Sequence, residues 1–150
     1  MKLAQLLLFL LIILIDQFIK LQILQNTPDT QVNSGMAFSL FKGNNTIILM
    51  LNLLIVAFVV YLLIKINKTG VLTKNKVLKL IEIFSLVLIL AGGTSNIIDR
   101  FRYGGVVDYL TLGNFPKFNL ADTAISSAFV FYILCRILLR LKKVKKFKSA

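Results

Sequence analysis

The sequence predicts an all-α membrane protein with four transmembrane helices in a single domain covering residues 1–150. Apolar residues make up 57% of the 150 positions, a larger share than in ordinary soluble domains. Four apolar stretches each reach about 20 residues, the length that a helix needs to cross the hydrocarbon core. Both prolines, Pro28 and Pro116, fall between these stretches, so no expected helix contains a helix-breaking residue.

The expected spans cover residues 3–24, 46–66, 77–98 and 120–141. They are predicted to be helices because an isolated strand cannot satisfy its backbone hydrogen bonds in lipid. The first span follows Met1-Lys2, as the apolar part of a secretory signal would, but it continues through Asp16 to Lys20 without a small-residue cleavage site. We therefore expect this segment to be retained as a transmembrane helix.

The distribution of positive charge predicts how the helices are oriented. The formal net charge is +12, and thirteen of the eighteen lysines and arginines lie at position 2, in residues 65–79 and in residues 136–148. Such clustering beside apolar segments indicates membrane topology and anionic lipid rather than nucleic acid as a partner. We therefore expect both termini in the cytoplasm of a multi-pass protein, with residues 25–45 and 99–119 on the external side.

The residue inventory excludes several classes of hydrolase. The chain has no histidine, which removes serine–histidine and cysteine–histidine nucleophiles and the His-Glu-x-x-His zinc proteases. Its one cysteine, Cys135, can form neither an internal disulfide nor a thiolate metal cluster, and its place in the last span favours a buried, inert thiol. By elimination the plausible catalytic groups are carboxylates, and we expect no metal and no cofactor.

Asp108 and Asp122 are the strongest candidates for such chemistry. The chain has only six acidic residues, and each of these two lies at the external edge of an apolar segment. Taken singly, Asp108 is an interfacial loop acid and Asp122 a first-turn acid that suits a helix dipole. Together, in so acid-poor a membrane chain, they favour a function, because intramembrane carboxylates mostly mark proton paths, ion sites or catalysis. Two that converge can share one proton, as an aspartic protease requires.

Other polar residues have both a structural and a functional interpretation. Asn96, Asp99 and Arg100 are spaced to share one helix face, which suits either a packing interface or the binding of substrate or phosphate. Asn119 directly precedes the last span and is a good N-cap. Asn33 lies in an Asn-Ser-Gly stretch that suits a tight turn, and its amide can also bind a substrate backbone.

Two acid–base spacings predict ion pairs. Asp16 and Lys20 are four residues apart in the first span, with the acid nearer the N-terminus, which is the favourable orientation for a helical pair. We interpret them as a structural pair near the membrane interface rather than as part of the chemistry. Glu82 lies three residues after Lys79, and we expect those two to pair at the surface.

Five short blocks of sequence, taken together, carry a family resemblance. In chain order they are Asp16-x-x-x-Lys20, Asn33-x-Gly35-x-Ala37-Phe38, Asn96-x-x-Asp99-Arg100, Val107-Asp108-Tyr109 and Phe118-Asn119-x-Ala121-Asp122. With these blocks the chain resembles lipoprotein signal peptidase, also called signal peptidase II, a family of bacterial membrane aspartic peptidases. One block alone is weak evidence, but all five in this order on four spans are highly specific.

The resemblance implies an endopeptidase that removes the signal peptide of a prolipoprotein just before its diacylglyceryl-modified cysteine. It implies that Asp108 and Asp122 are the catalytic dyad. The residues in its supporting or substrate-contacting set would be Asn33, Asn96, Asp99, Arg100 and Asn119. It also implies a small external region that cradles the substrate, where short β-strands are expected.

The resemblance further implies a location and partners. The protein would lie in the bacterial cytoplasmic membrane, with its active site near the external face. Its expected partners are a lipidated prolipoprotein and membrane lipids, with no nucleic acid, and we expect a monomer.

Two other functions stay open on the sequence alone. A small ion- or proton-coupled transporter would also place acids and asparagines in its helices. Here, however, the acids gather at one face instead of tracking across the membrane. A catalytically inactive relative would only bind lipidated peptides, but both aspartates are intact. A cleavage assay with a lipidated preprolipoprotein separates all three.

Overall fold

The computed structural model describes residues 2–27, 32–35, 43–69 and 76–148. Its four long helices are α1 (Leu3–Asn26), α2 (Asn45–Thr69), α3 (Lys76–Tyr103) and α4 (Leu120–Lys148). Each of the four expected spans lies within one of these helices, and all four helices are long and apolar enough to cross a membrane. The prediction of an all-α membrane fold is confirmed.

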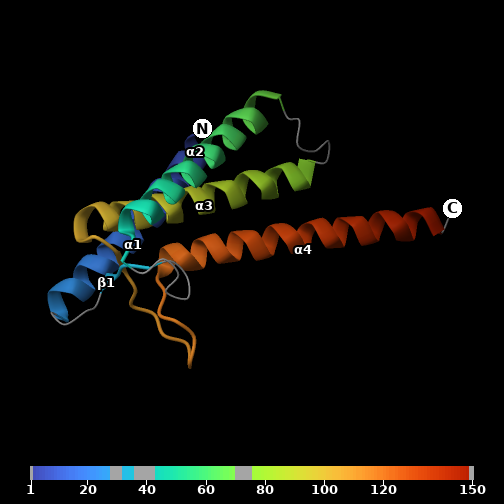
Figure 1. The fold of residues 1–150 in the computed structure, drawn as a ribbon. Helices are drawn as coiled ribbons and strands as arrows, with labels where there is room; N and C mark the ends of the chain where they lie inside the picture. Colours follow the sequence, from blue (N-terminus) through green and yellow to red (C-terminus); the bar gives the residue numbers. More distant parts are fainter. Residues whose placement is uncertain (1, 28–31, 36–42, 70–75, 149–150) are drawn as a thin grey trace.

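Helix α3 is the centre of the bundle, because it packs against each of the other three helices. Figure 1 shows α3 between α2 and α4, with α4 continuing well past the end of α3. Helices α3 and α4 approach each other closely at Gly92, where a Cβ atom would lie 2.5 Å from the carbonyl oxygen of Ala121. A glycine is required there, and it brings the first turn of α4 directly against α3.

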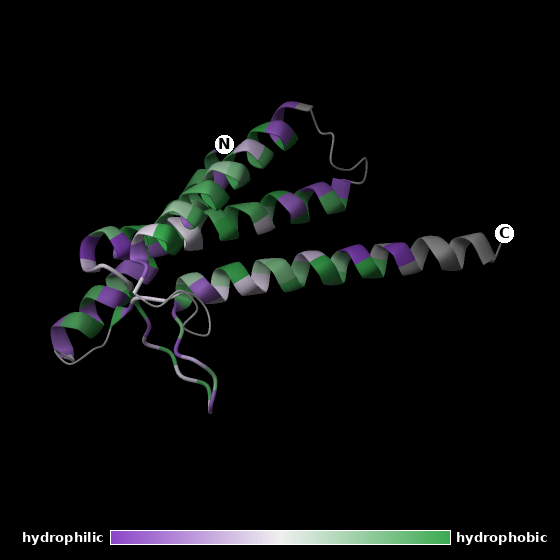
Figure 2. Ribbon diagram, in the orientation of Figure 1, coloured by the Kyte–Doolittle hydropathy of each residue, from purple (hydrophilic) through white to green (hydrophobic). Residues whose placement is uncertain are grey.

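Apolar side chains divide between a small core and a large outward-facing surface. The core cluster consists of Val59, Leu63, Val87 and Leu90. Many other large apolar side chains point outward, for example Leu14, which is 66% exposed, and Leu54, which is 67% exposed. Figure 2 shows apolar residues along the length of the helices and polar residues gathered toward their ends. This distribution suits helices whose outer surface faces lipid.

A short antiparallel sheet joins two loops at one end of the bundle, and short strands in this region were expected. Strand β1 (Val32–Asn33) pairs with β2 (Val106–Val107), with Asn33 opposite Val106. Gly105 permits this contact, because a Cβ atom there would lie 2.6 Å from the carbonyl oxygen of Asn33. The pairing therefore carries Asn33 to the segment that bears Asp108.

The expected surface pair between Glu82 and Lys79 is wrong. Glu82 is only 4% exposed, and its carboxylate lies 3.7 Å from a guanidinium nitrogen of Arg136 in α4. The sequence spacing indicated a partner within the same helix. The packing of α3 against α4 buries the carboxylate and supplies a partner from another helix.

Candidate active site

Asp108 and Asp122 lie at the end of the bundle where the sheet meets the start of α4. Asp108 directly follows β2 and is 6% exposed, while Asp122 lies in the first turn of α4 and is partly buried. Burial raises the pKa of Asp108 above its usual range, and the charge of the nearby Asp122 raises it further. A hydrogen bond from Asn33 opposes this shift, because it stabilises the ionised form.

Asn119 contacts both acidic residues. Its side-chain Nδ2 donates a hydrogen bond to Oδ1 of Asp108 at 2.8 Å. Its Oδ1 accepts the backbone N–H of Asp122 at 2.8 Å, which is the N-cap contact expected from the sequence. One side chain thus sets the positions of both acidic residues relative to α4.

Two further amides each donate to one oxygen of a carboxylate. Asn33 donates from Nδ2 to Oδ2 of Asp108 at 2.8 Å, and Asn96 donates from Nδ2 to Oδ1 of Asp122 at 2.8 Å. The Nδ2 of Asn119 also lies 3.3 Å from Oδ1 of Asn96, so the three amides form one connected set. The structure therefore brings together five of the residues that the sequence singled out.

A buried ionic cluster lies beside these amides and ties α1 to α3. The Nζ of Lys20 lies 2.7 Å from Asp16 and 2.8 Å from Asp99, and the three side chains are at most 1% exposed. Lys20 also donates to Oδ1 of Asn96 at 3.1 Å. The expected pair of Asp16 and Lys20 is present, but it is fully buried. The ammonium group of Lys20 contacts two carboxylates and the side-chain amide of Asn96.

Backbone N–H groups hold the two acids of this cluster in place. Asp16 accepts the backbone N–H of Ala121 at 3.1 Å, and Asp99 accepts that of Val107 at 3.2 Å. Ala121 and Val107 are the immediate chain neighbours of Asp122 and Asp108. The ionic cluster therefore fixes the backbone beside each candidate catalytic residue.

Sequence reasoning missed three side chains of this cluster, namely Gln17, Ser95 and Tyr109. Gln17 donates to Oδ1 of Asp99 at 2.8 Å, and Ser95 donates to Oδ2 of Asp16 at 2.6 Å. Burial raises the pKa of Tyr109 to about 12, so its hydroxyl stays protonated and donates to Asp16 at 3.3 Å. The available signal for Gln17 was its polarity beside Asp16 in an otherwise apolar span.

Arg100 reaches a different partner from its helix neighbours. Its guanidinium donates to the carbonyl oxygen of Gly35 at 3.2 Å and to that of Asn96 at 3.5 Å. Asp99 instead faces Lys20, so the three residues expected on one helix face are all buried but turn to different parts of the site. Ala37 and Phe38, which end the second sequence block, lie outside the described residues.

The comparisons with known proteins identify a family. The family model described as Signal peptidase (SPase) II matches residues 8–138. A lipoprotein signal peptidase of Thermodesulfovibrio yellowstonii is 34% identical over 142 residues, covering 82% of this chain and 87% of the relative. One of Dehalococcoides mccartyi is 33% identical over 137 residues, covering 81% of each chain. One of Halothermothrix orenii is 28% identical over 130 residues, covering 77% of this chain and 83% of the relative.

Solved structures support the fold independently. One described as a bacterial membrane enzyme superposes with a TM-score of 0.74 at 22% identity, covering 89% of this chain and 87% of that chain. A second with the same description has a TM-score of 0.70 at 21% identity, covering 88% and 91%. Because the family model extends over nearly all of the four helices and the relatives align over most of their own length, this chain belongs to the signal peptidase II family.

Proposed function

We propose that this protein removes the signal peptides of prolipoproteins by an aspartic mechanism in which Asp108 and Asp122 form the catalytic dyad. Membership of the signal peptidase II family makes the chain a peptidase of prolipoproteins in a bacterial membrane, and it does not favour a transporter. The aspartic mechanism is supported by one observation above all. Two carboxyl groups from separate segments converge on Asn119, whose side-chain Nδ2 donates to Asp108 at 2.8 Å and whose backbone N–H donates to Asp122 at 3.3 Å.

In this mechanism the two carboxyl groups share one proton. Like charges in close proximity resist ionising together, so at neutral pH one member is ionised and the other protonated. The ionised carboxylate takes a proton from a water molecule, whose oxygen attacks the scissile carbonyl carbon. The protonated carboxyl donates to the carbonyl oxygen as that carbon becomes tetrahedral. Transfer of a proton to the departing nitrogen then allows the carbon–nitrogen bond to break.

The surrounding amide side chains are compatible with transfer of the shared proton between the two carboxyl groups. The side chains of Asn33, Asn96 and Asn119 do not titrate, so they hold the carboxyl groups in place as the shared proton moves. Asn33 is itself held, because its Oδ1 accepts the backbone N–H of Gly35 at 2.9 Å while Arg100 binds the carbonyl oxygen of Gly35. We therefore assign Arg100 to positioning Asn33 rather than to contact with the reacting atoms.

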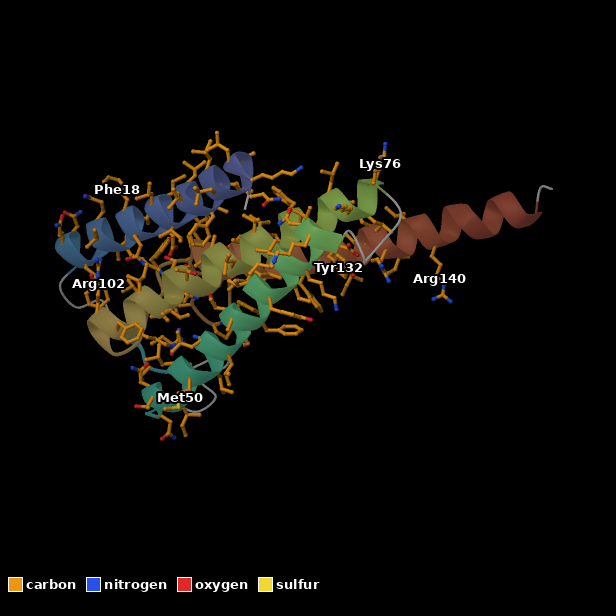
Figure 3. All side chains as sticks on the ribbon, turned by 90° about the horizontal axis from the view of Figure 1, so that it is seen from above. Phe18, Met50, Lys76, Arg102, Tyr132 and Arg140 are labelled. Atoms are coloured by element: carbon orange, nitrogen blue, oxygen red, sulfur yellow. The ribbon has the colours of Figure 1, made fainter. Side chains whose placement is uncertain are left out.

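We propose that both termini lie in the cytoplasm and that the dyad faces outward. Figure 3 places Lys76 and Arg140 toward one end of the molecule and Arg102 toward the other. The larger share of positive charge belongs to the end of Lys76 and Arg140, which is the pattern of a cytoplasmic side. A reporter fused after residue 150 should read cytoplasmic, and one fused near Tyr103 should read external. An external reading for the first fusion would reverse this orientation.

We also propose that the protein acts as a monomer with membrane lipids around it. The proposed dyad and the amides that hold it all come from one chain, so no second copy is needed to complete the site. The activity of single molecules, each reconstituted alone in a small lipid disc, should therefore match the activity at high protein density.

A cleavage assay tests the proposed function. Purified protein mixed with a lipidated preprolipoprotein should release a shortened product. Asp108→Asn and Asp122→Asn should each lower the rate by roughly 10³-fold or more, because a neutral amide cannot activate water. Glu82→Gln is the matched control, since Glu82 is a buried acid that contacts neither carboxyl group and faces Arg136. Full activity in either aspartate variant would exclude the dyad.

A further inference from the structure

The segment between the two proposed catalytic residues is a hairpin of residues 110–118 that leaves the bundle sideways. Its arms are joined by backbone hydrogen bonds in both directions, from Leu110 to Phe118 at 2.8 Å and from Phe118 to Leu110 at 3.0 Å. Gly113 turns the chain with a positive φ of 53°. Figure 1 shows this loop, in orange, running across the direction of α4 rather than along it. A segment that runs across a membrane-spanning helix is directed along the plane of the membrane.

The hairpin exposes large apolar side chains. Leu112 is 70% exposed, Phe115 is 55% exposed and Leu110 is 36% exposed. The ring of Phe115 packs edge-on against that of Phe118, with 6.0 Å between ring centroids, so the exposed ring has a defined support. In water such an apolar cluster on a protruding loop is unfavourable, and it normally marks a surface that another apolar phase covers.

The charge of the hairpin indicates which phase covers it. Residues 109–121 contain no acid and one cation, Lys117, which is exposed. Leucine, phenylalanine and lysine without acids are typical of segments that lie at the boundary between headgroups and acyl chains. The hairpin is also continuous with the lipid-facing surface, because α4 begins at Leu120 and its apolar span begins there too.

We propose that the hairpin inserts its apolar side chains into the external leaflet and so sets the depth at which the dyad meets its substrate. Asp108 lies two residues before Leu110, and Asn119 directly follows Phe118. An anchor between these points holds both carboxyl groups at a constant level relative to the lipid surface. The insertion itself needs no assumption about function. Its consequence for catalysis rests on the proposed function, in which a lipid-linked cysteine holds the scissile bond near that level.

The absence of tryptophan from the chain allows a direct test, because one introduced indole reports its surroundings without background. Leu112→Trp places the indole on the exposed apolar side of the hairpin. Thr111→Trp is the matched control, since Thr111 is the exposed polar neighbour of Leu112 in the same hairpin. Both variants are reconstituted into vesicles of anionic and zwitterionic lipid, with and without bromine on the acyl chains.

Insertion predicts different emission from the two variants. Leu112→Trp should emit at shorter wavelength and lose a large share of its intensity to bromines placed ~5–10 Å below the headgroup boundary. Thr111→Trp should keep the emission of an indole in water and lose little. Equal, water-like emission from both would overturn the anchor. So would emission from Leu112→Trp that changes only when lipidated peptide is added or when the protein is concentrated, because substrate or a second copy would then cover this side.

The catalytic consequence is measured separately. Leu112→Asp should slow cleavage per folded molecule severalfold in vesicles, whereas Thr111→Asp should leave the rate unchanged. Equal rates for these two variants would overturn the link between anchoring and catalysis. If Leu112→Trp is quenched as expected but the unmodified protein cleaves no prolipoprotein, the proposed function fails and the anchor stands.

Discussion

Asn119 and Asp122 exchange two hydrogen bonds across the first turn of α4. The side-chain Oδ1 of Asn119 accepts the backbone N–H of Asp122 at 2.8 Å, and Oδ2 of Asp122 accepts the backbone N–H of Asn119 at 3.3 Å. This reciprocal pair is a capping box, with aspartate in the position where glutamate is usual. The carboxylate of Asp122, which we propose is catalytic, is therefore also part of the N-terminal cap of α4.

Substitution of Asn119 should separate helix capping from the contact to Asp108. Serine is a good N-cap but lacks the amide N–H that reaches Asp108, whereas alanine lacks both. We expect Asn119→Ser to keep its thermal stability and lose cleavage rate. Asn119→Ala should lose rate and also about 1 kcal/mol of unfolding free energy. Thermal unfolding in detergent beside cleavage per folded molecule checks this, and a fully active serine variant would make the amide contact dispensable.

Loss of Lys20 should destabilise the protein more than loss of the charge of Asp16. Lys20→Met leaves two carboxylates, Asp16 and Asp99, buried without their cation, at a cost of roughly 3–5 kcal/mol. Asp16→Asn still leaves Lys20 paired with Asp99 and should cost less. Thermal unfolding is the measurement, with Lys68→Met on the exposed part of α2 as the control. Equal losses from the two cluster variants would contradict a shared cation.

Arg100→Ala should slow cleavage through the loop that carries Asn33. The guanidinium holds the carbonyl of Gly35, whose N–H binds Asn33. We expect a loss of roughly tenfold or more, the scale of one hydrogen bond to a charged group. The control is Arg102→Ala, because Arg102 is exposed two residues further along α3. Arg100→Lys should recover part of the rate if the carbonyl contact is what matters, and equal rates for the two alanine variants would contradict a positioning role.

Removal of the Asn33 amide should shift the dependence of cleavage on pH. Asn33 stabilises the ionised form of Asp108, so its hydrogen bond lowers a pKa that burial raises. Without it the pKa of Asp108 rises further, and the carboxyl keeps its proton to higher pH. We take Asp108 as the member of the pair that holds the shared proton, so we expect the alkaline limb of Asn33→Ala to move to higher pH while the acid limb stays. Asn67→Ala, on the exposed part of α2, should leave both limbs unchanged. A shift of the acid limb instead would make Asp108 the general base.

The sequence by itself determined the four spans and a short set of candidate residues. Span length and the rarity of charge are local properties, so a run of apolar residues predicts a membrane helix whatever packs beside it. The N-cap at Asn119 was predictable for the same reason, because its partner is the backbone of the following turn. The scarcity of acids likewise directed attention to Asp108 and Asp122 before any geometry was known.

Only the tertiary structure decided which of these residues meet. Asp16 accepts a hydrogen bond from the backbone of Ala121, which is 105 residues away in the sequence. Lys20 forms ion pairs both with Asp16 in its own helix and with Asp99 in α3. Glu82 pairs with Arg136 in α4 instead of with Lys79 in its own helix. Sequence spacing predicts only contacts within one helix, whereas these partners depend on which faces of different helices pack together. For α3 and α4 the packing depends on the close approach at Gly92, where a side chain larger than hydrogen would collide with the backbone of Ala121.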